Sequence, residues 1–228
     1  MGMDFQTVKL WRKSQRERQI AARVALSPDT VESFRKSIDA SLERSFPGLA
    51  QRRVAFCWPI KNEYDARFLA RTLRERGALT ALPVVVAPKQ PLAFREWRPG
   101  VRLAHGPLDI PYPADSAEVE PEAVLVPMNG WDAKGYRLGY GGGFFDRTLA
   151  SLPKKPVVIG VSYEMARMET IHPQAWDIPM DYVVTERGVY RRDPEGLAFL
   201  GAPEPSGSGV MSSPVCYADE NYFGGKDR

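Results

Sequence analysis

The sequence predicts an α/β domain of three layers, in which a mostly parallel or mixed central sheet is flanked by helices. The main observation is that short apolar runs, typical of buried strands, alternate with stretches of helical period. A second is length, because 228 residues fit one domain with some additional sequence. A third is composition, because 43% hydrophobic and 26% charged residues allow a buried core and argue against global disorder.

Two helices are expected at the N-terminus. The segment from Phe5 to about Ala25 is basic and contains neither Gly nor Pro. Ser27 is a typical N-cap, and Pro28 suits the first position of a second helix. This helix should end before Pro47, and its apolar residues recur every three or four positions, at Val31, Phe34, Ile38 and Leu42.

A strand–helix–strand unit follows. The apolar run Val54–Trp58 predicts a buried strand, and Asp65 to Arg76 has helical period before Gly77 ends it. Further strands are expected at Thr80–Val86, Leu92–Trp97, Val101–Ala104, Ala123–Val126, Val157–Val161 and Tyr182–Thr185, and Tyr182–Thr185 should be the last strand of the core. A surface loop is expected over Gly106–Pro121 and a helix from near Phe144. Residues 1–200 should thus form a single domain, and the low-complexity residues 203–228 a mobile tail.

Charge and composition exclude several function classes. The formal net charge is only +3, but residues 1–60 carry +5 and the remainder carries −2, so the excess is local and gives no case for nucleic-acid binding. No apolar run approaches the roughly 18–20 residues that span a bilayer, and the start lacks a secretory signal. Two cysteines and two histidines rule out a disulfide framework and most metal clusters. We therefore expect a cytoplasmic protein with no membrane or nucleic-acid partner.

The most informative segment is rich in glycine. Residues 135 to 143 contain five glycines, which let backbone N–H groups converge on an anion, and a helix beginning at Phe144 would add its positive pole. Arg137 supplies a cation on one side, and Asp146 a carboxylate that could hold Mg²⁺ on the other. The segment matches neither a Walker A motif nor a dinucleotide-binding fingerprint, because Phe144 follows Gly143. It predicts a nucleoside-triphosphate site of another type.

The run Arg137-Leu-Gly-Tyr-Gly-Gly-Gly-Phe-Phe-Asp146 resembles the signature of the 5-formyltetrahydrofolate cyclo-ligase family, Arg-Leu-Gly-x-Gly-x-Gly-Tyr/Phe-Tyr-Asp. Other segments resemble the family in the right order, namely Arg12-Lys13-Ser14-Gln15-Arg16, Trp58-Pro-Ile-Lys-Asn-Glu63, Leu82-Pro-Val-Val85, Val124-Leu-Val-Pro127 and Trp176-Asp-Ile-Pro-Met-Asp181. The resemblance implies closure of 5-formyltetrahydrofolate, with or without a polyglutamate tail, to 5,10-methenyltetrahydrofolate. ATP would be the co-substrate and Mg²⁺ the cofactor, and ADP and phosphate would be released. The enzyme is expected to be a monomer or a weak dimer.

The resemblance also implies roles for individual residues. Arg137 and Arg16 would be catalytic, and Asp146 and Asp177 would hold the metal. The residues implied to bind ATP are Arg12, Lys13, Arg16, Arg137, Leu138, Gly139, Tyr140, Gly141, Gly142, Gly143, Phe144 and Phe145, and those implied to bind the folate are Trp58, Glu63, Tyr140 and Phe144.

Several alternatives stay open at this level. The N-terminal cations could use the register of Arg12 and Arg16 or that of Lys9 and Lys13, and either Phe144 or Phe145 could face the folate while the other packs in the core. Glu63 could instead cap a helix, and Asp177 could turn the chain. The alternative function is a folate- or nucleotide-binding paralogue that does not turn over.

Overall fold

The computed structural model describes residues 3–202, so the tail predicted for residues 203–228 lies outside the described part. Its α-helices are α1 (Phe5–Val24), α2 (Pro28–Ser45), α3 (Arg67–Glu75) and α4 (Phe144–Ser151), and 3-10 helices cover Pro47–Gln51, Pro107–Asp109 and Glu164–Ala166. The strands are β1 (Arg53–Ala55), β2 (Leu79–Val85), β3 (Leu92–Glu96), β4 (Leu103–His105), β5 (Pro111–Pro113), β6 (Ala123–Pro127), β7 (Gly130–Asp132), β8 (Arg137–Leu138), β9 (Val157–Val161), β10 (Arg167–Met168), β11 (Tyr182–Thr185), β12 (Gly188–Arg192) and β13 (Leu197–Gly201).

The two N-terminal helices begin where side-chain caps fix them. The Asp4 carboxylate accepts hydrogen bonds from the backbone N–H groups of Gln6 and Thr7 at the start of α1. The Ser27 hydroxyl accepts one from the N–H of Thr30 at the start of α2, as the sequence predicts.

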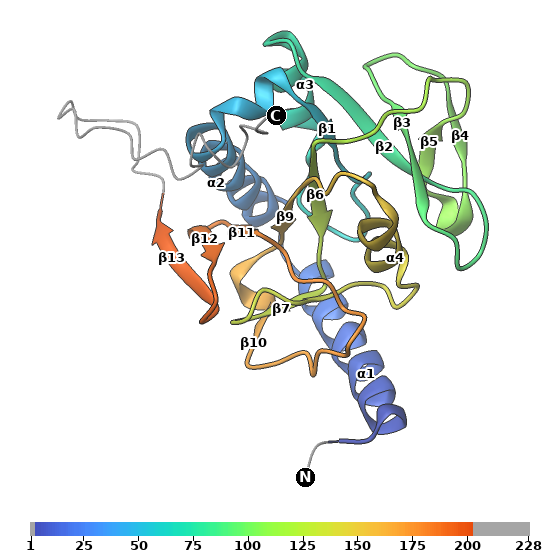
Figure 1. The fold of residues 1–228 in the computed structure, drawn as a ribbon. Coiled ribbons are helices and arrows are strands. Elements are labelled where there is room, and N and C mark those ends of the chain that lie inside the picture. The colour runs from blue at the N-terminus through green and yellow to red at the C-terminus, as the bar shows by residue number, and fades with distance from the viewer. Residues whose placement is uncertain (1–2, 203–228) are drawn as a thin grey trace, which may run out of the picture.

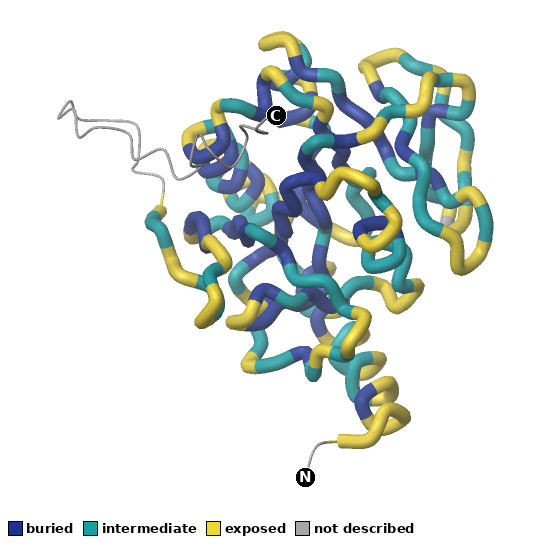
Figure 2. Tube along the Cα trace, in the orientation of Figure 1, coloured by how far each residue is buried: buried dark blue, intermediate teal, exposed yellow. Residues whose placement is uncertain are grey.

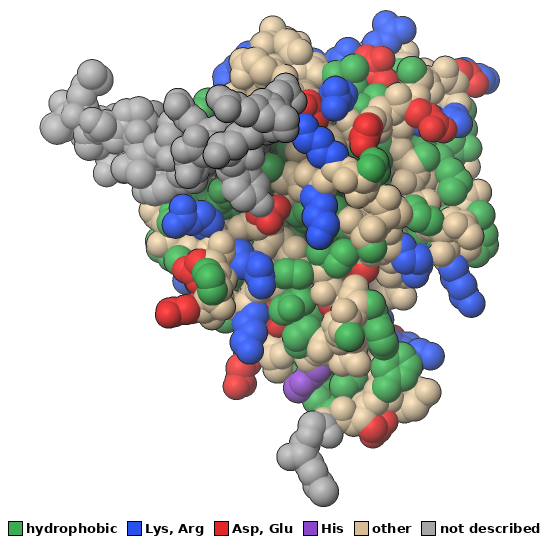
Figure 3. Space-filling view, in the orientation of Figure 1, with side chains coloured by type: hydrophobic (Ala, Val, Ile, Leu, Met, Phe, Trp, Pro, Cys, Tyr) green, Lys and Arg blue, Asp and Glu red, His purple; other side chains and the backbone are tan. Residues whose placement is uncertain are grey.

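Basic and acidic side chains are interspersed over the face seen in Figure 3. Among residues 3–202, no helix combines the length and the apolar character that crossing a membrane requires.

The central sheet has eight strands in the order β13-β12-β11-β9-β6-β1-β2-β3 (Figure 1). Its inner strands, from β11 to β2, are parallel, and the edges are antiparallel through the pairs β2/β3, β11/β12 and β12/β13. One core cluster packs α2 and α3 against one face of the sheet, and a second packs α4 and the β7 hairpin against the other. The inner strands are the most continuously buried part of the chain (Figure 2). The predicted three-layer fold with a mixed sheet is confirmed.

The order of the strands creates a crevice at the carboxyl ends of the inner strands of this sheet. From β1 the chain crosses through α3 to β2 on one side, whereas β6 lies on the other side and is followed by α4. Leu69 of α3 and Leu149 of α4 belong to different core clusters, so the two helices cover opposite faces. A sheet wound in two directions leaves a crevice at the carboxyl ends of the strands where the direction changes. Here that point lies between β1 and β6.

Some elements differ from the sequence prediction. Tyr182–Thr185 is not the last strand, because β12 and β13 extend the sheet as an antiparallel edge. The segment predicted as a loop contains β5, whose prolines Pro111 and Pro113 are tolerated because it pairs with β4 in a small two-stranded sheet. Strands β7 and β8 form a hairpin ahead of the glycines, and β10 pairs with β7. Short strands with Pro, Gly and charged residues give little sequence signal.

Gly188 offers a test of the antiparallel edge. Its φ is +138°, and a Cβ atom at this position would collide with the backbone carbonyl of Gly201. We predict that Gly188→Ala lowers the free energy of unfolding by about 2 kcal/mol, because both strain and overlap must be relieved. Gly48→Ala is the control, since its Cβ would meet no atom within 4 Å. Chemical denaturation measures both, and equal midpoints for the two variants would contradict the pairing of β12 with β13.

Candidate active site

A cavity of about 610 Å³ opens at the carboxyl ends of the parallel strands, between α1, the β1–α3 segment and the glycine loop Gly139–Gly143. Cationic side chains (Lys9, Arg12, Arg16 and Arg137) and carboxylates (Glu63, Asp146 and Asp177) line it together with Trp58, Leu138, Tyr140, Phe144 and Phe145. Every residue predicted for the site except Lys13 is therefore in the wall of one cavity. Of the residues predicted for the site, Arg12 and Asp177 are 165 positions apart in the chain, and the fold brings them together.

Helix α1 presents one face to the cavity. Lys9, Arg12 and Arg16 follow one another at spacings of three and four residues and so lie on the same side of the helix. Lys13 lies on the solvent side, where its side chain is 70% exposed and 4.0 Å from the Glu17 carboxylate. The structure thus does not support an ATP contact for Lys13, because its direction from the helix axis carries it away from the cavity.

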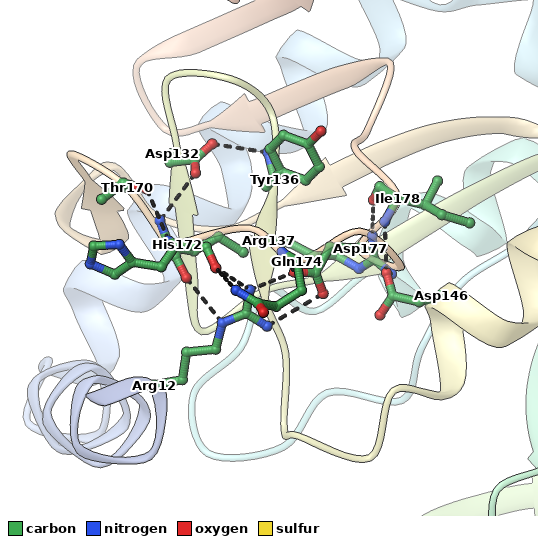
Figure 4. Close-up of polar contacts among 11 residues, drawn as sticks. Arg12, Asp132, Tyr136, Arg137, Asp146, Thr170, His172, Gln174, Asp177 and Ile178 are labelled. Atoms are coloured by element: carbon green, nitrogen blue, oxygen red, sulfur yellow. Dashed lines mark hydrogen bonds and ion pairs between the residues drawn. The ribbon is translucent and has the colours of Figure 1, made fainter. Parts of the chain in front are cut away.

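The guanidinium of Arg12 is occupied by the segment that follows β10 (Figure 4). Its Nη2 donates to Asp177 Oδ2 at 2.5 Å and to the carbonyl of His172 at 2.9 Å, and its Nε donates to the carbonyl of Ile171 at 3.0 Å. The Asp177 carboxylate also accepts from the backbone N–H of Gln174. Arg12 therefore fastens α1 to residues 171–177, and the Asp177 carboxylate balances its charge.

Arg16 differs from Arg12 because its charge is not balanced by a carboxylate in the cavity wall. Its Nε is buried and has no hydrogen-bond partner among the described residues. Its guanidinium packs on Gly141, where φ is +92° and a Cβ atom would lie 3.1 Å from Arg16 Cζ, so glycine makes this approach feasible. Burial and the nearby Arg12 charge lower the pKa of Arg16. An anion bound beside the glycine loop would supply the missing counter-charge.

Arg137, which is buried, and Asp146, which is partly buried, form a second ion pair beside the loop. Arg137 Nη2 donates to Asp146 Oδ1 at 2.8 Å, and Arg137 Nη1 donates to the carbonyl of Ile178 at 2.6 Å. Asp146 Oδ1 also accepts from the N–H of Ile178. Burial lowers the pKa of Arg137, while the Asp146 carboxylate opposes that effect. Asp146 lies in the first turn of α4, so the positive pole of this helix points toward the same region.

Asp132 positions these groups without lining the cavity. Its buried carboxylate accepts hydrogen bonds from the N–H groups of Lys134 and Ile171. It also accepts one from the N–H of Tyr136 (Figure 4). It therefore joins the β7–β8 hairpin, which carries Arg137, to the segment that carries Asp177. Asp132 was not among the site residues predicted from the sequence, because its role depends on backbone groups that the fold brings to it.

Glu63 lies in a buried polar cluster at the far end of α1. Its Oε1 accepts from Tyr140 OH at 2.7 Å and from Arg23 Nη2 at 3.4 Å. Burial raises the pKa of Glu63, while the Arg23 charge opposes this. Arg23 is itself buried and donates further to the side chain of Asn129 and the carbonyl of Lys61. Sequence reasoning missed Arg23, whose signal was a single cation among the apolar residues that end the helix.

The aromatic residues of the wall divide into two kinds. Phe145 is partly buried against the second core cluster, whereas Phe144 belongs to neither cluster and its ring lies over Gly142. Trp58 is half-buried, and the Arg67 guanidinium lies 4.6 Å from its ring centroid. Of the two phenylalanines, Phe144 is therefore the one more free to meet a ligand.

The carboxylates suit a metal only together with an anionic ligand. Among residues 3–202, no group of three or more His, Cys, Asp or Glu side chains is arranged to hold a metal ion. Mg²⁺ commonly binds one or two protein carboxylates, phosphate oxygens and waters. Asp146 fits that pattern because both of its hydrogen bonds use Oδ1. Asp177 fits it only if Arg12 shifts, because both Asp177 oxygens accept from Arg12.

Comparisons with known proteins agree with this site. The model of the 5-formyltetrahydrofolate cyclo-ligase family matches residues 8–186. The 5-formyltetrahydrofolate cyclo-ligase of Mycolicibacterium smegmatis is 33% identical over 150 residues, which are 62% of this chain and 77% of the relative. The cyclo-ligase of Escherichia coli is 29% identical over 175 residues, 74% of this chain and 96% of the relative.

A solved structure extends the similarity to the fold. The 5,10-methenyltetrahydrofolate synthetase of Aquifex aeolicus superposes with a TM-score of 0.69 at 28% identity and covers 83% of this chain and 97% of its own. The region matched by the family model contains α1 from Val8 onward, the glycine loop and all the carboxylates of the cavity. The chain therefore belongs to the 5-formyltetrahydrofolate cyclo-ligase family and is a ligase.

Proposed function

We propose that this enzyme uses ATP to close 5-formyltetrahydrofolate to 5,10-methenyltetrahydrofolate, with release of ADP and phosphate. The observation that carries the proposal is one cavity that contains an arginine whose buried Nε has no hydrogen-bond partner among the described residues, a glycine loop and a buried carboxylate. The first two are suited to phosphates, and Glu63 is suited to a ring that presents N–H groups. The relatives from Mycolicibacterium smegmatis and Escherichia coli are named 5-formyltetrahydrofolate cyclo-ligases, after the ring closure proposed here.

The reaction needs no protein nucleophile. The oxygen of the formyl group carried by N5 attacks the γ-phosphorus of ATP, and the bond between this phosphorus and the bridging oxygen that leaves with ADP breaks. N10 then attacks the phosphorylated formyl carbon, the new C–N bond forms, the C–O bond to phosphate breaks, and the N10 proton is released. Because each bond changes between the two substrates, the protein acts by positioning them and by neutralising charge on the transferred group.

Arg16 packs on Gly141, and Arg137 lines the same cavity just before the glycine loop in the chain, so we assign both to the phosphates. Backbone N–H groups of Gly139–Gly143 and the start of α4 supply further donors. Arg12 would hold Asp177 in place and meet a phosphate only on leaving it. Asp146, with Asp177 as second ligand if Arg12 shifts, would hold Mg²⁺, which would neutralise phosphate charge when bound.

Glu63 would accept hydrogen bonds from the N–H and amino groups of the pterin ring. Tyr140 and Arg23 hold its carboxylate in position from behind. Trp58 and Phe144 offer flat apolar surface in the same cavity. The folate would thus bind toward the C-terminal end of α1, with its formyl group directed at Arg16.

The direct test mixes the purified enzyme with 5-formyltetrahydrofolate, ATP and Mg²⁺ and follows the near-ultraviolet absorbance of the methenyl product. Growth that requires ATP, with one ADP formed per product, supports the proposal. Tight binding of both ligands without ADP formation would instead identify a non-catalytic binding protein.

Because Arg16 lines the cavity and Lys13 does not, replacing these two cations should have different effects on catalysis. Arg16→Ala should raise the KM for ATP and lower kcat by about 100-fold or more, because a buried positive group at the phosphates is lost. Lys13→Ala is the matched control and should change neither constant, since Lys13 is exposed outside the cavity. Steady-state kinetics decides, and a large effect of Lys13→Ala would show that the other register is used.

Asp146→Asn tests the metal assignment. The amide can still accept from Arg137 and from the N–H of Ile178, so folding stability should change little, while kcat should fall on the order of 100-fold because the charge is lost. The Mg²⁺ concentration for half-maximal rate should also rise. Asp115→Asn, which breaks an exposed ion pair with Arg102 outside the cavity, serves as the control. Unchanged Mg²⁺ dependence in Asp146→Asn would refute the assignment.

The raised pKa of Glu63 predicts the acid side of the pH profile. Only the carboxylate accepts two N–H bonds, and a raised pKa keeps the group protonated to higher pH. The kcat/KM for the folate should therefore rise with pH through a midpoint above 4.5, the ordinary carboxyl value. Glu63→Gln should remove this limb, whereas Glu186→Gln, at another carboxyl whose pKa burial raises, should retain it. A limb that persists in Glu63→Gln would disprove the assignment.

A further inference from the structure

The residues Ile60–Glu63 form a tight turn in the segment between β1 and α3. The backbone N–H of Glu63 donates to the carbonyl of Ile60 at 3.1 Å, which closes the turn. Both central residues have a positive φ, +52° at Lys61 and +57° at Asn62. Positive φ at both central positions characterises a type I′ turn, in which Gly, Asn and Asp predominate. Asn62 therefore suits this turn, whereas Lys61 adopts a conformation that its Cβ atom disfavours.

The side chain of Glu63 bonds back to the first residue of its own turn. Its Oε2 accepts from the backbone N–H of Ile60 at 3.1 Å, while its Oε1 accepts from Tyr140 and Arg23. Both carboxylate oxygens are thus held, one of them by the turn itself. Ile60 and Glu63 both line the cavity, so the conformation of the turn sets the direction of the carboxylate there.

The C-terminal end of α1 holds the two left-handed residues. Arg23 Nε donates to the carbonyl of Lys61 at 2.8 Å, and Asn62 Nδ2 donates to the carbonyl of Val24 at 3.3 Å. A left-handed conformation in a residue other than glycine persists where its surroundings enforce it, and such residues cluster at functional sites. Lys61 and Asn62 are both exposed and lie outside the cavity wall. Any influence that they have on a ligand must therefore pass through the backbone of the turn.

We propose that the turn Ile60–Glu63 pre-orients the Glu63 carboxylate for the folate, and that Lys61 and Asn62 are positioning residues that act through its left-handed conformation. This inference rests on the proposed function, in which Glu63 binds the pterin ring. A carboxylate that is fixed before the ring arrives loses little conformational freedom on binding, which favours affinity. The strain at the two central residues accompanies this pre-orientation, and the contacts with α1 offset it.

The test compares two substitutions at Lys61 that differ in their tolerance of positive φ. Lys61→Gly adopts this conformation freely, whereas Lys61→Val resists it because valine is β-branched. Both variants lose the ammonium group that lies 5.9 Å from the centroid of the Tyr140 ring, so charge does not distinguish them. Calorimetry without ATP should show that Lys61→Val binds 5-formyltetrahydrofolate about 10-fold more weakly than Lys61→Gly. The affinity for ATP, measured without folate, should be equal in the two variants.

Asn62 provides a second pair of variants. Asn62→Gly keeps the tolerance of positive φ and loses the hydrogen bond to Val24, whereas Asn62→Ala loses both. Asn62→Ala should therefore weaken the folate by about 10-fold, and Asn62→Gly should stay close to the wild type. Lys89 has a φ of +61° and lies outside the cavity wall, so Lys89→Val is the control and should alter neither ligand.

The outcomes separate this inference from the proposed function. Equal folate affinities in Lys61→Val and Lys61→Gly, in enzymes that bind ATP normally, would overturn the positioning role alone. Parallel losses of folate and ATP affinity in Lys61→Val would also overturn it, since the turn would then only support α1. If Lys61→Val does not fold, the Asn62 pair decides, and equal folate affinities in Asn62→Ala and Asn62→Gly would count against the role of the turn. A wild-type enzyme that does not bind the folate would overturn the proposed function and the positioning role with it.

Discussion

The attachment of α1 across the carboxyl edge of the sheet is the constraint on which the site depends. Two of its arginines make the attachment, Arg12 to the segment around Asp177 and Arg23 to Glu63 and Asn129. Both are paired with carboxylates in a region of low solvent exposure, where breaking one partner of a pair is costly. Because of these contacts, residues from the first quarter of the chain face a loop more than 100 positions later.

The arginines in and beside the cavity fall into two groups. Arg12, Arg23 and Arg137 are already neutralised by carboxylates, and their hydrogen bonds hold backbone segments in place. Arg16 is held between these fixed points and packs on Gly141, but its buried Nε has no hydrogen-bond partner among the described residues. A rigid surrounding with an arginine that no carboxylate of the cavity wall neutralises is a preorganised anion site, since the enzyme need not reorganise when a phosphate arrives. The small net charge of the whole chain conceals this arrangement.

The sequence predicted most of the fold and the composition of the cavity, but not how its charges are paired. Periodicity and the Ser27 cap located the helices because these signals are local, and the glycine run marked the loop because backbone geometry demands glycine at Gly141. The Arg12–Asp177 pair joins positions 165 residues apart, so no local pattern predicted that Arg12 is anchored while Arg16 is not. The edge strand β13 was missed because an exposed strand needs little hydrophobic periodicity, and β12 was missed because its buried part is only the short run Gly188–Tyr190. The sequence also could not predict that the Lys13 side chain faces solvent, because this depends on which side of α1 faces the cavity.

The central claim is that this cavity transfers the γ-phosphoryl group of ATP to the formyl oxygen of the folate. The most direct measurement uses 5-formyltetrahydrofolate labelled with ¹⁸O in the formyl group and analyses the released phosphate by mass spectrometry. The account predicts that each phosphate carries the formyl oxygen, because the C–O bond breaks when N10 closes the ring. Unlabelled phosphate formed together with the methenyl product would contradict it, since ATP would then be hydrolysed by water in a separate event.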